Sequence, residues 1–98
     1  MKRAYLFLYN SEVGTREKLR ELIDQMPEVS NWLYELPYCF YLVSELSAHD
    51  LAYRLRAVTG GKGRFLVTEV GTNKQGWLPP ASWRFLNEKP NPGEDPGA

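Results

Sequence analysis

The chain has 98 residues, of which 43% are hydrophobic and 24% are charged, and its 12 basic side chains balance its 12 acidic ones. This length allows one domain with one hydrophobic core. The zero net charge argues against a nucleic-acid binder that depends on a basic surface overall, although it allows a local basic patch. No apolar run approaches the roughly 20 residues that cross a bilayer, so we expect no membrane partner. Because Cys39 is the only cysteine, no internal disulfide can form, and a reducing, cytoplasmic compartment is the simplest expectation.

The first third of the chain predicts a strand followed by a helix. Residues 4–9 form a short apolar and aromatic run that is typical of a buried central strand. Thr15 is suited to cap the helix that follows, and Pro27 ends that helix. Between them, large apolar side chains recur at the spacing of one buried helical face: Leu19, Leu22, Ile23 and Met26.

Two aromatic segments follow, at residues 31–36 and 38–43, and they predict two strands that turn near Pro37. One long strand with a bulge is the alternative. Cys39 lies within the second segment, where we expect a small buried core residue and not a reactive thiol.

A second helix and a fourth strand are predicted next. Ser47 is suited to cap a helix whose apolar face carries Leu51 and Leu55, and the Gly60-Gly61 pair ends it. Residues 65–70 then have the composition of a strand. The last apolar stretch, 76–86, predicts a short helical turn on which Trp83 and Leu86 share a face.

The predicted order is therefore β-α-β-β-α-β, which indicates an α+β protein. We expect a ferredoxin-like sandwich, with an antiparallel sheet, two helices on one face and a short C-terminal helical turn. Residues 1–87 would form the domain, and residues 88–98, rich in proline and glycine, would be a disordered tail. The second face of the sheet also needs a cover. Either the C-terminal segment or a second subunit would supply it.

Several segments together show a family pattern: Tyr9-Asn10, Trp32, residues 47–51, residues 63–70, residues 76–79 and residues 83–86. In this pattern and in length, residues 3–87 resemble the small SinR-like proteins, relatives of the CRISPR-associated adaptation endonucleases and of VapD-type toxin ribonucleases. The resemblance implies a ferredoxin-like fold and a homodimer.

The same resemblance bears on catalysis. In the nuclease relatives an aspartate just after the first strand helps to hold a divalent metal near the dimer axis. The matching residue here is Asn10, and an amide ligates magnesium much less well than a carboxylate does. Glu12 is a weak substitute candidate. We therefore expect no metal site and no cofactor, with magnesium or manganese entering only if the protein is a nuclease after all.

Basic side chains are the remaining functional signal, and six of them mark a candidate nucleic-acid surface: Arg16, Arg20, Arg54, Arg56, Lys62 and Arg64. Our leading hypothesis is a non-catalytic or weakly active homodimer that binds nucleic acid or a protein partner. The alternatives are a metal-dependent endoribonuclease or endodeoxyribonuclease, and a purely structural protein-interaction module.

Overall fold

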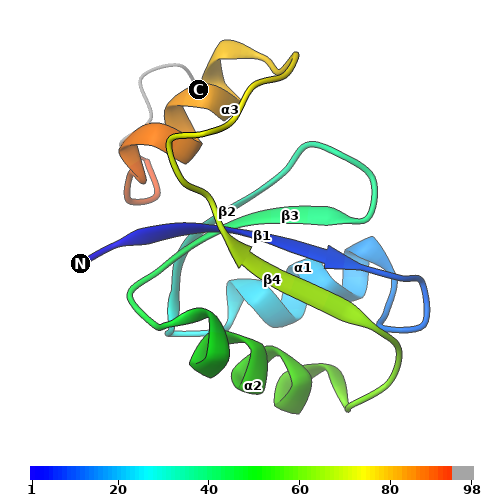
Figure 1. Cartoon of the computed structure of the whole chain (residues 1–98). Helices are drawn as coiled ribbons and strands as arrows, with labels where there is room; N and C mark the ends of the chain where they lie inside the picture. The colour runs from blue at the N-terminus through cyan, green and yellow to red at the C-terminus, as the bar shows by residue number, and fades with distance from the viewer. Residues whose placement is uncertain (94–98) are drawn as a thin grey trace.

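The computed structural model describes residues 1–93, and Figure 1 shows a sheet with helices on both sides. The elements are β1 (Arg3–Tyr9), α1 (Arg16–Asp24), β2 (Val29–Tyr34), β3 (Cys39–Ser44), α2 (Ala48–Thr59), β4 (Phe65–Glu69) and α3 (Pro80–Glu88). The predicted α+β class is confirmed. Because β2 and β3 are separate strands, the alternative of one long strand is wrong. Within residues 1–93, no helix is long and apolar enough to cross a membrane.

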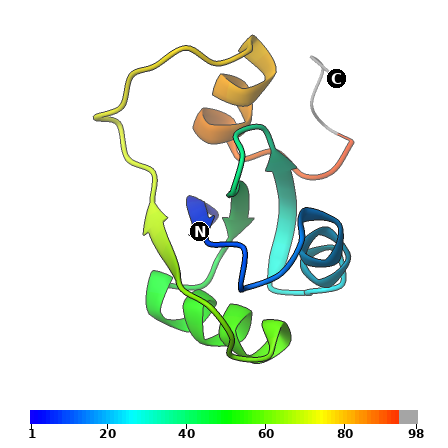
Figure 2. The same ribbon diagram turned by 90° about the vertical axis from the view of Figure 1, so that its right-hand side faces the viewer.

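The four strands pair antiparallel in the order β2-β3-β1-β4. The strands β1 and β3 lie in the centre, which explains their continuous apolar and aromatic character. This sheet is compatible with a ferredoxin-like α+β class. Helices α1 and α2 lie on one face of the sheet, and α3 lies on the other (Figures 1 and 2).

The first face of the sheet carries the larger core. Phe7, Phe40 and Leu42 on the central strands pack with Leu19 of α1 and Leu55 of α2, and all five are fully buried. Both predicted caps are present: the Thr15 hydroxyl accepts from Lys18 N and the Ser47 hydroxyl accepts from Asp50 N, each at 3.1 Å. This core is the layer that positions α2.

The end of α1 differs from the prediction. The helix ends at Asp24, before Pro27, so Met26 lies beyond it and is not part of a helical face. Met26 is nevertheless buried in the same core, because the turn into β2 folds it inward. Leu22 is only partly buried.

The second face carries a smaller core under α3. Instead of a short turn, the C-terminal segment forms a nine-residue helix, whose buried residues are Ser82, Phe85 and Leu86. Trp83 and Leu86 lie one turn apart on α3 and line one hollow, as predicted, although Trp83 is only partly buried. Phe85 and Leu86 pack against Cys39 and Tyr41 of β3.

The chain beyond α3 returns to β2. Glu88 belongs to α3, Pro90 is buried, and the carbonyl oxygen of Pro90 accepts from Asn31 Nδ2 at 3.0 Å. A side-chain hydrogen bond also joins Lys2 to Asn91. Disorder was predicted for residues 88–98. Of these, residues 94–98 lie outside the described residues.

Candidate nucleic-acid interface

Asn10 joins the end of β1 to the start of β4. Its side-chain oxygen accepts from Arg64 N at 3.2 Å, and its backbone N–H donates to Arg64 O at 3.0 Å. The amide nitrogen of Asn10 lies 3.4 Å from Glu12 Oε1. The Asn10 side chain therefore provides a hydrogen-bond acceptor for the backbone N–H of Arg64. The family resemblance would place a metal-binding aspartate at this position.

Glu12, the substitute candidate, is exposed in the turn after β1. Among residues 1–93, its one polar side-chain contact is the long one with Asn10. Across residues 1–93, no three histidine, cysteine, aspartate or glutamate side chains gather in a way that would hold a metal ion. The Asn10 side chain thus holds the backbone of Arg64.

Gly63 allows the loop before β4 to approach this turn. Its φ is +76°, and a Cβ atom here would lie 2.5 Å from Val13 N and 2.7 Å from Asn10 Oδ1. Any other residue would force the backbone apart. The close approach fixes the positions of Lys62 and Arg64 on either side of the glycine.

The structure does not bring the six predicted cations together. The Arg16 guanidinium lies 5.3 Å from the ring centre of Tyr34, and that of Arg20 lies 5.9 Å from Trp32. Both rings belong to β2, at one edge of the sheet. These two arginines therefore make cation–π contacts at the edge opposite β4.

Arg54 is engaged as well. Its Nε atom lies 2.7 Å from Glu28 Oε2, in an ion pair that links α2 to the turn before β2. This pair is partly buried, so the guanidinium is already neutralised. Arg16, Arg20 and Arg54 are thus all less available to a phosphate than the sequence suggested.

The other three cations lie at the β4 edge, around a surface hollow of about 690 Å³. Its lining residues are Ala52, Tyr53, Arg56, Gly63, Arg64 and Phe65. Lys62 lies on the adjoining loop. Among residues 1–93, no carboxylate pairs with Arg56, Lys62 or Arg64. These cations are the ones free to meet an anion.

Tyr53 is the functional candidate that sequence reasoning missed. Its side chain is 68% exposed at the mouth of this hollow, and the ring of His49 lies 4.9 Å from it, centre to centre. A signal was present in the sequence, because Tyr53 and Arg56 are one helical turn apart and both fall outside the buried positions Leu51 and Leu55. We call Tyr53, Arg56, Lys62 and Arg64 the β4-edge site.

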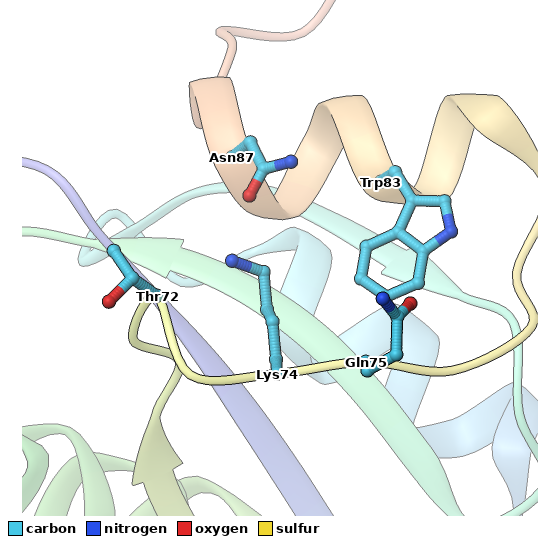
Figure 3. A pocket seen from close by; sticks show the side chains of 5 residues that line it. All are labelled: Thr72, Lys74, Gln75, Trp83 and Asn87. Carbon is cyan, nitrogen blue, oxygen red and sulfur yellow. The ribbon is translucent and has the colours of Figure 1, made fainter.

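A second hollow, of about 490 Å³, lies between α3 and the segment that follows β4. In Figure 3, Lys74 and Gln75 rise from that segment towards Trp83 and Asn87 of α3. Lys74 is the one cation among its lining residues, and its Nζ atom donates to Gly71 O at 2.9 Å. With this charge already bonded to the backbone, the hollow suits a polyanion less well than the β4-edge site does.

Cys39 is buried, as expected, beneath α3. Burial raises the pKa of its thiol from 9.0 to about 11. The thiol is therefore protonated at neutral pH and serves as a core residue.

Comparisons of the chain with protein-family models, with curated proteins and with solved structures give no match.

Proposed function

We propose that this protein is a non-catalytic, homodimeric, cytoplasmic nucleic-acid-binding protein with a ferredoxin-like fold, and that the β4-edge site holds a single strand. The observation that carries the proposal is the exposed Tyr53 ring beside Arg56 and Arg64, two arginines that no carboxylate of residues 1–93 neutralises. The strand order β2-β3-β1-β4 supports the ferredoxin-like arrangement. The sequence pattern shared with the SinR-like proteins supports the homodimer.

The chemistry of the β4-edge site suits a single strand better than a duplex. An exposed aromatic ring can stack on one base, which contributes about 1–3 kcal/mol, and a paired base in a duplex does not present its face. Arg56 and Arg64 line the same hollow as Tyr53, Lys62 lies on the adjoining loop, and all three can neutralise neighbouring phosphates. One ring and three cations make a small binding surface, so we expect weak binding of nucleic acid that is sensitive to salt.

The proposal excludes catalysis because of Asn10. Its side-chain oxygen is already an acceptor for Arg64 N, and an uncharged amide is a poor ligand for magnesium. The nuclease alternative would need a different ligand set. The protein-interaction alternative would need no basic site at all.

Binding of short labelled single-stranded RNA and DNA, followed by fluorescence anisotropy over a salt series, tests the proposal. The double variant Arg56→Gln/Lys62→Gln should bind at least about tenfold more weakly and should lower the salt slope by about 1.4, since each phosphate contact to a single strand contributes about 0.7. Lys18→Gln/Arg20→Gln, which removes the same charge from α1, should bind like the wild type.

Equal losses in both double variants would contradict the β4-edge site. The same samples run on a gel with manganese would reveal cleavage, and cleavage by the wild-type protein would replace this proposal with the nuclease. Neither binding nor cleavage would favour a protein partner.

A further inference from the structure

A third hollow lies on the second face of the sheet, between the sheet, α3 and the 70–78 segment that joins β4 to α3. Its volume is about 320 Å³. Leu6, Leu8 and Tyr41 line it from the sheet, and Trp83 and Leu86 line it from α3. Figures 1 and 2 show the 70–78 segment leaving β4 and rising to α3, on the side away from α1 and α2. Because a water occupies about 30 Å³, this volume suits a ligand of about ten non-hydrogen atoms.

Most of the lining of this hollow is apolar. Within residues 1–93 no aspartate or glutamate contributes to it, and its further apolar residues are Leu36, Cys39, Val70 and Leu78. Trp77 lines the hollow as well, although it is 96% exposed. Sites for small molecules combine apolar and aromatic walls of this kind with a few polar groups that select the ligand. Tyr41 and Lys74 supply such groups here.

Tyr41 brings an unused hydrogen-bond donor to the hollow. The residue is only 1% exposed, and no group of residues 1–93 forms a hydrogen bond with its hydroxyl. Burial, with smaller effects of Cys39 and Glu35, raises the pKa of Tyr41 to about 12, so the hydroxyl keeps its proton at neutral pH. Polar groups in protein interiors usually have a hydrogen-bond partner. The Tyr41 hydroxyl can therefore donate to an oxygen atom of a molecule in the hollow.

Lys74 brings one positive charge. It is the one cation among the lining residues of residues 1–93, and its Nζ atom donates to Gly71 O at 2.9 Å. An ammonium group has three N–H donors, so two remain for an anion. Figure 3 shows the Lys74 side chain rising towards α3, where the neighbouring 490 Å³ hollow shares Lys74, Gln75 and Trp83 with this one. A single cation beside apolar walls suits one carboxylate on an apolar body, and not a chain of phosphates.

We propose that this hollow binds a compact apolar carboxylic acid, with its carboxylate bonded to Lys74 Nζ and the Tyr41 hydroxyl and its apolar body against Leu6, Leu8 and Trp77. Burial of the apolar body drives binding, and the two polar contacts select an acid over a neutral molecule. The hollow lies on the face of the sheet opposite to α1 and α2. The proposal is therefore independent of the β4-edge site.

Isothermal titration calorimetry of the full chain with octanoate, and with 1-octanol as the neutral molecule of the same chain length, tests the ligand class. Octanoate should bind the wild-type protein with a dissociation constant of about 1 mM or lower. Lys74→Gln should weaken the binding of octanoate about fivefold and leave that of 1-octanol unchanged. Lys18→Gln, which removes the same charge from α1, should change neither.

Two further variants test the place of binding. Leu8 is 39% exposed at the rim, and Leu8→Trp should fill the hollow and weaken the binding of both probes at least about tenfold, with an unchanged circular dichroism spectrum. Tyr41→Phe keeps the ring and should weaken octanoate binding about threefold. Its melting temperature should not fall, because the hydroxyl has no partner among residues 1–93.

Each of these results can overturn a stated part of the proposal. No binding of octanoate at about 10 mM, or binding that Leu8→Trp leaves unchanged, would overturn the site itself. Octanoate binding that survives Lys74→Gln in full would overturn the carboxylic acid and favour a neutral apolar ligand. A lower melting temperature of Tyr41→Phe, or unchanged affinity for octanoate, would overturn the contact with the hydroxyl. Because single-strand binding is measured separately, none of these outcomes decides the proposed function.

Discussion

Asn10 and Arg64 are joined by two hydrogen bonds, one from Asn10 N to Arg64 O at 3.0 Å and one from Arg64 N to Asn10 Oδ1 at 3.2 Å. The second bond continues the β1–β4 pairing with a side chain after β1 itself has ended. The oxygen of the asparagine side chain is therefore used to bond the backbone of the loop before β4. Asn10 thus has a structural role.

Gly63→Ala should be strongly destabilising. The added methyl group would lie 2.5 Å from Val13 N, and the positive φ is unfavourable for alanine. We expect a loss of about 2–3 kcal/mol in the free energy of unfolding, measured by urea denaturation. Gly60→Ala is the matched control, because its φ is also positive but nothing lies within 4 Å of the added atom. A similar loss in both variants would show that the approach to Val13 is unimportant.

Asn10→Asp should keep the fold and gain no nuclease activity. The carboxylate can still accept from Arg64 N, but it would face Glu12 at the distance where the amide now lies, 3.4 Å. We expect a cost of about 0.5–1 kcal/mol at pH 7 that shrinks as the carboxylates are protonated at lower pH. Asn10→Ala removes the acceptor and should cost about 1 kcal/mol at every pH. Metal-dependent cleavage by Asn10→Asp would mean that the scaffold is a nuclease that has lost one ligand.

Local sequence signals predicted the elements of the first face well. Thr15 and Ser47 cap their helices as expected, because a cap depends only on neighbouring residues. Met26 was misplaced because its spacing fits a helical face, whereas the chain leaves the helix after Asp24 and reaches the core by a turn.

The candidate site was predicted less well, because charge alone does not show which partner a cation has. Arg20 lies over the ring of Trp32, and Arg54 pairs with Glu28, and both contacts join elements distant in sequence. The spacing of Tyr53 and Arg56 puts both on the exposed side of α2, but this spacing alone does not distinguish a binding residue from any other exposed one. Tyr53 becomes a candidate binding residue because the fold brings Arg64 into the same hollow.

Stability should fall at high pH because of the core under α3. Burial raises the pKa of the Cys39 thiol from 9.0 to about 11. The pKa of Tyr41 is raised from 10.0 to about 12, mainly by burial and to a smaller extent by the nearby Cys39 and Glu35. Both groups are neutral in the folded protein and ionise more easily when it unfolds. Their contribution is therefore complete below pH 9. It is lost as the pH rises towards 11 for Cys39 and 12 for Tyr41, with a slope of about 1.4 kcal/mol per pH unit for each group.

Denaturant titrations at pH 8, 10 and 11 measure this loss. Cys39→Ala should show a smaller decline than the wild type between pH 8 and pH 11, because only Tyr41 of the pair would still titrate. Identical declines would contradict the assignment to Cys39.

Phe85→Ala should show that α3 is part of the folded domain. Phe85 is buried against Tyr41, with ring centres 6.4 Å apart, so its truncation should cost about 3 kcal/mol. Trp83→Ala is the control on the same helix, and it should cost less because Trp83 is only partly buried. If Phe85→Ala melted at the wild-type temperature, α3 would not be a stabilising cover of the sheet.

The most direct test of the central claim is photochemical cross-linking of the wild-type protein to a single-stranded oligonucleotide that carries 5-iodouridine, followed by peptide mapping. The β4-edge site predicts that the base cross-links to Tyr53, and that Arg56→Gln/Lys62→Gln reduces the yield severalfold. Cross-links confined to Trp77 or Trp83, on the opposite side of the sheet, would contradict the claim.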